Sequence, residues 1–365
     1  WRYLYGGSST TIAFTNVVCS SIAIVKINLN NLIISQFFSY LCKVKKIFIM
    51  KRAILFFSIF LVSSFTLYAQ PNEHVANLEH NYFYKGDFVN VFNMSNDLSG
   101  YAEIISDPYN SFIVSLYKFL SEIHLGSIDN EEAHACLNKL TEKATNLYGE
   151  FSRYMGIVHL AKSHYSLFGD YKDALVNGKK SVEILSSVAP NSMELARALM
   201  ITGYACVFNG DSQSGEKLLL KALDTMKKNR QQKSWIAMHT HSYLAATYVY
   251  LGKANDAVEE VGKSMDIVNS MEMDGRVFRL AMDPYAMAVF VFTSVGLYDE
   301  AIQTGQDLLE FTEIMQMENN IVYGNTLQNI GAAYLLKKDD KTGLDYYRLA
   351  KEHYEKYGYT NISQY

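Results

Sequence analysis

The chain has 365 residues and a formal net charge of -4, and 49% of its residues are hydrophobic. The charge is unevenly distributed, because residues 1–70 contain seven basic residues and no Asp or Glu. The remaining 295 residues carry 26 basic and 37 acidic residues, a formal charge of about -11. This acidic balance excludes nucleic acid and anionic membrane surfaces as expected partners of the region 70–365.

The sequence after Met50 has the order of a secretory signal peptide. Lys51 and Arg52 are followed by an apolar run from 53 to 68, and Ala69 precedes a cleavage point before Gln70. This order predicts export, to the periplasm if the source is bacterial. An uncleaved anchor that leaves the region 70–365 facing the periplasm is the alternative. No Cys follows the run, so the residue that carries a bacterial lipoprotein anchor is missing.

Residues 1–49 precede that signal and contain no Met. Because a signal peptide acts from the N-terminus, we interpret this segment as translated upstream or disordered sequence, with the natural start at Met50. A first membrane segment near 11–25 is the rival interpretation, although that run is short and is interrupted by Asn16 and two Ser residues.

A short turn signature recurs along the region 70–365. It consists of a Gly, one further residue and then an aromatic or small residue, and the intervals between copies are 40 to 44 residues. A small or aliphatic residue follows each clear Gly by five positions, where two helices of a hairpin would approach closely. The turn copies are at Gly86, Gly126, Gly169, Gly210, Gly252, Gly296 and Lys338, and the close-contact residues include Ala174, Gly215, Ala257 and Ala301.

This pattern resembles the tetratricopeptide repeat (TPR) family, which places an aromatic residue four positions before the turn Gly. The matching residues here are Tyr82, Tyr165, Tyr248, Phe292 and Tyr334, and the family's small residues are at Gly203, Ala245 and Gly331. The resemblance implies an all-α, right-handed solenoid of about seven antiparallel helical hairpins over 70–365. The interval near 42 residues departs from the family's 34 and implies longer helices.

Helical periodicity supports hairpins independently of the family. After Lys253, apolar residues recur at helical spacing and charged residues occupy the remaining positions, which predicts one buried and one exposed face. The apolar set is Val258, Val261, Met265 and Val268, and the charged set is Glu259, Glu260, Lys263 and Asp266. With four Pro residues and no alternating apolar runs after residue 70, no strands are expected.

Three helix-start signals stand out. Asn191 with Glu194 resembles a capping box, and Asp107 with Pro108 gives a cap followed by a first-turn proline. Asp283 with Pro284 either begins a helix or kinks one that starts at Gly275.

The family resemblance also implies which residues line the concave wall formed by the first helices. They are mixed polar and aromatic side chains, a composition suited to peptide binding. The alternative is that Tyr204 and Tyr250 only pack between helices. The ten candidate residues are His159, Ser163, Arg197, Tyr204, His239, Tyr243, Tyr250, Asn325, Gln328 and Asn329.

Catalytic and metal motifs are missing from this sequence. His239 and His241 are two positions apart, and His159 and His164 are five apart, so neither pair shares a helical face as i, i+4 residues do. Cys136 and Cys206 are expected to be core residues rather than metal ligands or a disulfide. No Gly-rich phosphate loop or nucleophile elbow appears. We therefore predict no enzyme, no metal and no cofactor.

These observations favour an exported binding module that holds a protein or peptide partner. One form of this function is a free scaffold, and another is the sensing ectodomain of a longer signalling protein that continues beyond Tyr365. The alternatives are an α/α-toroid enzyme acting on a glycan with two carboxylates, and a small-molecule sensor with a pocket lined by residues such as Phe290 and Tyr334.

Overall fold

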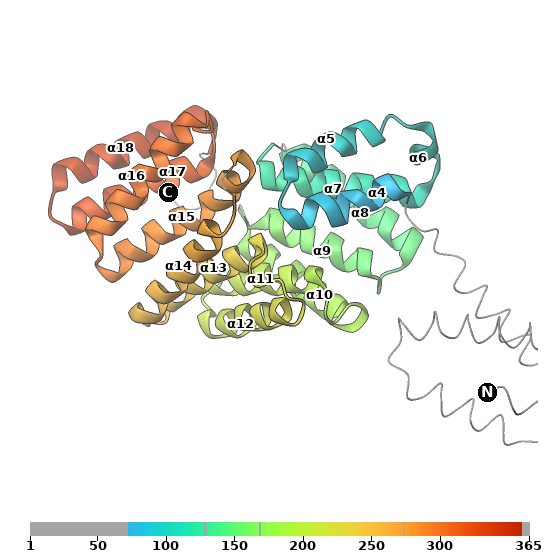
Figure 1. Ribbon diagram of the computed structural model, residues 1–365, viewed down its shortest axis with the longest axis horizontal. Helices are drawn as coiled ribbons and strands as arrows, with labels where there is room; N and C mark the ends of the chain where they lie inside the picture. Colours follow the sequence, from blue (N-terminus) through green and yellow to red (C-terminus); the bar gives the residue numbers. More distant parts are fainter. Residues whose placement is uncertain (1–71, 128–129, 168, 273, 360–365) are drawn as a thin grey trace, which may run out of the picture. The chain divides into compact units, whose positions relative to one another are not determined.

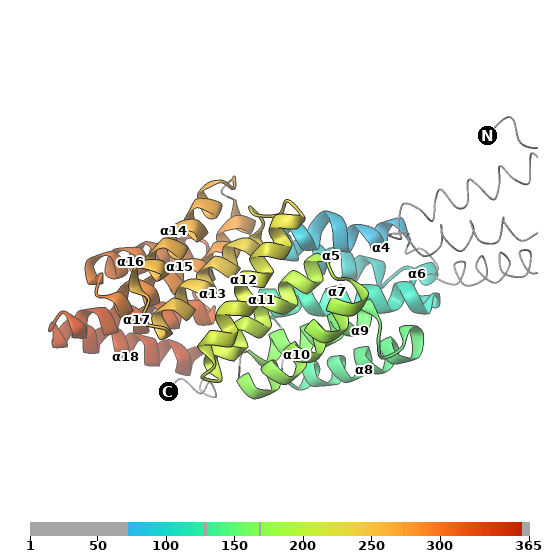
Figure 2. The ribbon, with the colours of Figure 1, turned by 90° about the horizontal axis from the view of Figure 1, so that it is seen from below.

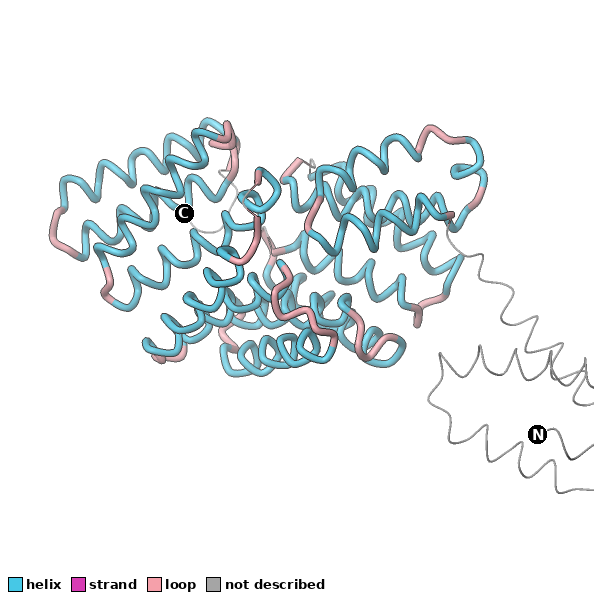
Figure 3. Tube along the Cα trace, viewed as in Figure 1, coloured by secondary structure: helices cyan, strands magenta, loops and turns pink. Residues whose placement is uncertain are grey.

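A computed structural model describes residues 72–127, 130–167, 169–272 and 274–359. The segments interpreted as upstream sequence (1–49) and signal peptide (50–69) lie outside the described residues. Residues Gln70–Tyr365 form one contact unit, and every regular element described in it is a helix (Figure 3). The fold is therefore all-α, as predicted.

The helices follow one another in chain order (Figure 1). They are α4 (Glu73–Asn77), η1 (Leu78–Tyr82), η2 (Phe83–Lys85), α5 (Phe88–Leu98), α6 (Ala102–Ser106), α7 (Pro108–Leu125), α8 (Asn130–Tyr148), α9 (Arg153–Ser166), α10 (Tyr171–Val188), α11 (Met193–Phe208), α12 (Ser212–Lys228), α13 (Trp235–Tyr250), α14 (Ala254–Asn269), α15 (Gly275–Val295), α16 (Tyr298–Ile314), α17 (Ile321–Leu336) and α18 (Asp340–Tyr357).

From α9 onward the helices pair as hairpins. Each odd-numbered helix packs against the even-numbered helix that follows it, and the first helices α11, α13, α15 and α17 also contact one another in order. Two perpendicular views show this stacking of neighbouring hairpins (Figures 1 and 2). Because each hairpin buries its apolar faces against its neighbours, the result is a solenoid. The predicted solenoid of helical hairpins is confirmed.

The turn signature ends the first helix of a hairpin. Gly210, Gly252 and Gly296 adopt left-handed backbone conformations with φ of 82°, 71° and 88°. Such values favour Gly, which has no Cβ to clash with the preceding turn. In the last hairpin Lys338 takes the same role with φ of 66°. The repeated glycines are thus required by the geometry of the turn.

Small residues set the distance between the helices of a hairpin. A Cβ added at Gly215 would lie 2.8 Å from the carbonyl oxygen of Gly203, and one added at Gly343 would lie 2.9 Å from that of Gly331. In other hairpins the equivalent close-contact residue is a fully buried Ala, at Ala174, Ala257 and Ala301. The close approach expected five residues after the turn Gly is therefore present.

The helix starts partly differ from the expectations. Asp107 caps α7 through Tyr109, and Pro108 occupies its first turn, as predicted. The capping box at Asn191 was wrong, because Ser192 is the cap and accepts a hydrogen bond from the Leu195 N–H. The carboxylate of Glu194 is instead ion-paired with Arg153.

Two further expectations concern residues that lie inside helices, Pro284 and Glu260. Pro284 lies within α15, which begins at Gly275, so Asp283 with Pro284 does not start a helix. Glu260 was assigned to the exposed face of its helix, and this was wrong, since it is 7% exposed. Buried carboxylates require partners, and Glu260 has them in His241 and Lys263.

Helix α15 is long and apolar enough to cross a membrane by length and composition alone. In this structure 56% of that window is buried within the protein. It lies between α13 and α17 and contacts both, so its apolar residues are explained by packing inside the solenoid.

The first hairpin turn contacts helices that are distant in sequence. A Cβ at Gly86 would lie 2.6 Å from a methyl carbon of Leu280 and 3.2 Å from the indole of Trp235. Arg276 donates a hydrogen bond of 2.8 Å to the carbonyl of Lys85. The segment 73–98 therefore packs against α13 and α15 as well as against its neighbour α7.

We expect Gly215→Ala to lower the free energy of unfolding by about 1–3 kcal/mol, because the new methyl group would overlap the Gly203 carbonyl. The matched control is Gly262→Ala in α14, where nothing lies within 4 Å; it should be neutral or stabilise by up to about 1 kcal/mol. Urea unfolding followed by circular dichroism measures both. Equal stability of the two variants would contradict the close approach.

Candidate functional site

Four side chains occupy the same position in successive first helices. Arg197, His239, Asp283 and Asn325 each lie 15 residues before the first residue of the second helix of their hairpin, which begins at 212, 254, 298 and 340. Because stacked hairpins share one register, these positions lie on the same wall of the solenoid. We call these four residues the inner ladder.

The first member of the inner ladder is covered by the N-terminal segment. Arg197 is 2% exposed, and its guanidinium carbon lies 4.7 Å from the ring centre of Phe83 and 5.5 Å from that of Trp235. Its Nη2 lies 3.3 Å from Nε2 of His124. Burial lowers the pKa of Arg197. This arginine is therefore part of the interior, packed against the rings of Phe83 and Trp235.

An ion-paired arginine joins the same segment to two first helices. Arg153 of α9 contacts the carboxylates of Glu79 and Glu194, which are 6% and 4% exposed. Its Nε donates a 2.8 Å hydrogen bond to Glu194. Burial alone would raise the pKa of Glu194, but Arg153 and further hydrogen bonds hold it below its usual value. The triad fixes α9, α11 and the N-terminal segment together.

The second member of the inner ladder, His239, hydrogen-bonds to a backbone group that the helix itself leaves unpaired. Pro284 has no N–H, so the carbonyl of Leu280, four residues earlier, has no partner in the helical ladder. The ring of His239 hydrogen-bonds to that backbone group. His239 is 8% exposed, and burial lowers its pKa. Its imidazole therefore has a structural role in joining α13 to α15.

Asp283 differs from the two members before it because its side chain is exposed to solvent. Burial nevertheless raises the pKa of its carboxyl, with His239 acting in the opposite direction. Burial is the largest cause of the raised pKa values of Tyr204 and Tyr243, and the charge of Asp283 raises both further. An accessible carboxylate surrounded by protein on most sides is the expected result of a position on the inner wall.

Aromatic rings lie on the same helix as Asp283 and on the two first helices before it. Tyr204 and Tyr243 are stacked, with ring centres 4.0 Å apart and planes at 16°. Tyr250 and Phe290 have ring centres 6.0 Å apart, and Tyr250 is 54% exposed. These rings come from α11, α13 and α15. We call the set Tyr204, Tyr243, Tyr250, Asp283 and Phe290 the tyrosine surface.

The other predicted residues are placed as follows. His159 is half-buried and its Nδ1 lies 3.0 Å from Asn177, whereas Ser163 is fully buried and donates a 2.7 Å hydrogen bond to the Ala174 carbonyl. Asn325 accepts a 2.6 Å bond from the hydroxyl of Tyr354. Gln328 accepts a weaker one at 3.3 Å from the same hydroxyl, and Asn329 is half-buried.

The structure thus separates the ten candidates. Burial of Ser163 and Arg197 leaves no free surface on either side chain, so a partner would reach them only if the segments over them moved. Tyr204 is half-buried and stacks on Tyr243, which is 8% exposed, whereas Tyr250 is 54% exposed and lies beside Phe290. A ligand-binding role remains a prediction for all ten residues.

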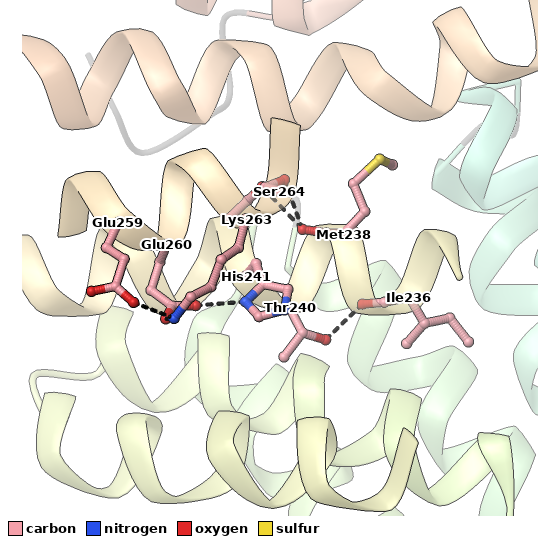
Figure 4. A network of polar contacts seen from close by, with 9 residues as sticks. Ile236, Met238, Thr240, His241, Glu259, Glu260, Lys263 and Ser264 are labelled. Atoms are coloured by element: carbon pink, nitrogen blue, oxygen red, sulfur yellow. Dashed lines mark hydrogen bonds and ion pairs between the residues drawn. The ribbon is translucent and has the colours of Figure 1, made fainter. Parts of the chain in front are cut away.

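A separate polar network lies between α13 and α14 (Figure 4). The Nδ1 of His241 lies 2.5 Å from Glu260, and Lys263 donates bonds of 2.7 Å to Glu260 and 2.8 Å to Glu259. Burial would raise the pKa of Glu260, but these hydrogen bonds bring it below its usual value. Glu260 is therefore a stably ionised group that ties the two helices together.

His241 also borders a surface pocket of about 350 Å³ between α12 and α13. Its other lining residues are Leu223, Asp224, Met226, Lys227, Gln232 and Ala237. Neither Phe290 nor Tyr334, the residues suggested for a small-molecule pocket, lines it. Among the described residues, no three His, Cys, Asp or Glu side chains gather as metal ligands. Cys206 is buried and Cys136 half-buried.

The hairpins, their turns and the small residues between their helices define the architecture. The chain folds as a TPR-like solenoid. A comparison with protein-family models finds no match, and a comparison with curated proteins also finds none.

Solved structures similar to this TPR-like solenoid include three helical repeat proteins. A signal transduction ATPase with a tetratricopeptide repeat sensor from Pyrococcus horikoshii has 18% identity and a TM-score of 0.42, over 75% of this chain and 40% of that one. BtubC from P. vanneervenii has 13% identity and a TM-score of 0.43, over 68% and 92%. The apo form of RapI has 9% identity and a TM-score of 0.46, over 67% and 98%.

The sequence prediction missed Asp283 as a member of the tyrosine surface. In the sequence, Asp283 is part of a helix-start signal with Pro284. The register offered a usable clue, because Asp283 lies 44 residues after His239 and 42 before Asn325, both of which were predicted. Counting back from the turn at Gly296 would have placed it beside them in the TPR-like solenoid.

The buried histidines should make this TPR-like solenoid less stable in mild acid. Burial lowers the pKa of His164 to about 3, so below about pH 6.5 the unfolded chain binds a proton that the folded chain does not. Stability is then lost as pH falls from 6.5 towards 3, at about 1.4 kcal/mol per pH unit for this group. His164→Gln should flatten that slope in urea unfolding. The exposed His74→Gln should leave it unchanged, and identical slopes for both variants would contradict the assignment.

Proposed function

We propose that this chain is a binding scaffold that holds an extended peptide segment of a partner protein on the tyrosine surface. The observation that supports it is the pair of ring contacts, Tyr204 with Tyr243 and Tyr250 with Phe290, that three successive first helices contribute, with the exposed Asp283 on the third of these helices. Tyr side chains give a large contact area at low cost in conformational entropy, and they combine an apolar ring with a hydroxyl.

The fixed position of one ring and the exposure of another favour a role in peptide binding over a purely structural role. Tyr204 is held in place by its stack on the buried Tyr243, so little freedom is lost when a partner contacts it. Tyr250 leaves more than half of its side chain in solvent. A wall built from stacked first helices presents such positions at regular intervals, which suits an extended chain.

Short hairpin turns argue against the α/α-toroid enzyme. That alternative needs acidic residues on long inter-helix loops, whereas the turns after α11 and α13 span only 209–211 and 251–253. The scaffold proposal also includes export, on the strength of the charged and apolar segments at 50–69. A periplasmic location and a sensing role in a longer signalling protein belong to the same proposal.

Selection of peptides tests this function directly. Purified protein is immobilised and a library of randomised 12-residue peptides is selected on it, and one enriched peptide is synthesised for titration by fluorescence anisotropy. We expect Tyr250→Ala to weaken its binding about tenfold, the usual effect of truncating an aromatic anchor. Because Tyr250 is exposed, the melting temperature should change little.

The matched control is Leu349→Ala, which truncates another exposed apolar side chain, in α18, with 49% exposure. It should bind the peptide like the unmodified protein. Failure to enrich any peptide, or equal affinity of the Tyr250→Ala and unmodified proteins, would overturn the proposal.

A further inference from the structure

The carboxylate of Asp283 lacks a counter-charge. It accepts no hydrogen bond and forms no ion pair within the described part of the chain. It differs in this from the buried carboxylates Glu79, Glu194 and Glu260, which are all held by Arg, His or Lys side chains. A charge that is partly desolvated and unpaired destabilises the folded protein, unless something else compensates for it.

The cationic groups around Asp283 do not neutralise it. Arg279 lies four residues earlier on α15, but its guanidinium makes no ion pair with Asp283 among the described contacts. The imidazole of His239 is bonded to the Leu280 backbone, and burial lowers its pKa, so it is neutral near pH 7. The site is therefore left with one uncompensated negative charge.

Aromatic rings complete the chemistry around this carboxylate. The charge of Asp283 acts on both Tyr204 and Tyr243, which form a stacked pair. The faces of such rings attract ammonium and guanidinium groups. Tyr243 is 8% exposed, so the half-buried Tyr204 is the ring of this pair that a partner can reach. The carboxylate and this ring both attract a Lys or Arg side chain, and the carboxylate repels an acidic one.

We infer that the tyrosine surface selects peptides that carry a Lys or Arg side chain, and that this side chain pairs with the carboxylate of Asp283. The inference rests on the proposed peptide-binding function and adds the chemistry of the partner. The acidic balance of residues 71–365 acts in the same direction, because it attracts a basic segment before contact.

The test repeats the randomised peptide selection with three proteins. Peptides selected on the unmodified protein should contain more Lys and Arg than the input library. Asp283→Asn keeps the size of the side chain and removes the charge, so this excess should disappear. Asp266→Asn removes an exposed acid from α14, away from the first helices, and should leave the excess unchanged.

A double-mutant cycle then assigns the contact. Replacing the basic residue of one selected peptide by norleucine should weaken binding to the unmodified protein about tenfold, but binding to Asp283→Asn by less than about twofold. Asp283→Lys should turn the preference towards Asp and Glu. Melting temperatures of all variants confirm that they fold.

The outcomes separate the two proposals. Selection that yields no peptide overturns the peptide-binding function and this inference with it. Peptides that depend on Tyr250 but show no excess of Lys or Arg overturn the inference alone. An excess of basic residues that persists in Asp283→Asn also overturns it, because another group would then be responsible.

Discussion

Close contact between the two helices of each hairpin is the constraint on which the rest of this structure depends. At Gly203 and Gly215 the backbones approach so closely that a single Cβ would overlap a carbonyl oxygen. This contact fixes the number of residues between the close-contact positions and the turn. As a result, the same side-chain position recurs on the inner wall of each hairpin, 15 residues before the second helix. The inner ladder is a consequence of that register.

The N-terminal segment divides the inner ladder into a covered and an open part. Phe83 covers Arg197, and Glu79 is paired with Arg153. These contacts bury two carboxylates and one guanidinium, which is tolerable only because ion pairs and aromatic rings compensate for lost hydration. Asp283 and Tyr250 have no such cover, since both are exposed. The side chains that a partner can reach are therefore only some of the side chains that form the inner wall.

Burial and accessibility must be distinguished at Asp283. Its side chain contacts solvent, yet the protein around it raises the pKa of the carboxyl. In such a position an ion pair with an incoming cation is less screened than on an open surface. The proposed contact therefore gives this carboxylate more influence on partner choice than the acids on the outer helices.

The sequence by itself determined the hairpins, the glycine turns and the small residues between helices, because each depends on residues within one hairpin. The family resemblance named Tyr204, Tyr243 and Tyr250 as candidates for the concave wall, and their binding role stays a prediction. Only the tertiary structure decided that Arg197 is buried, that Glu260 is ionised inside the protein and that Asp283 joins the tyrosines. Those features arise where helices from different parts of the chain meet, such as Glu79 with Arg153. The helical periodicity of one segment does not predict which buried charges form ion pairs with residues of another segment.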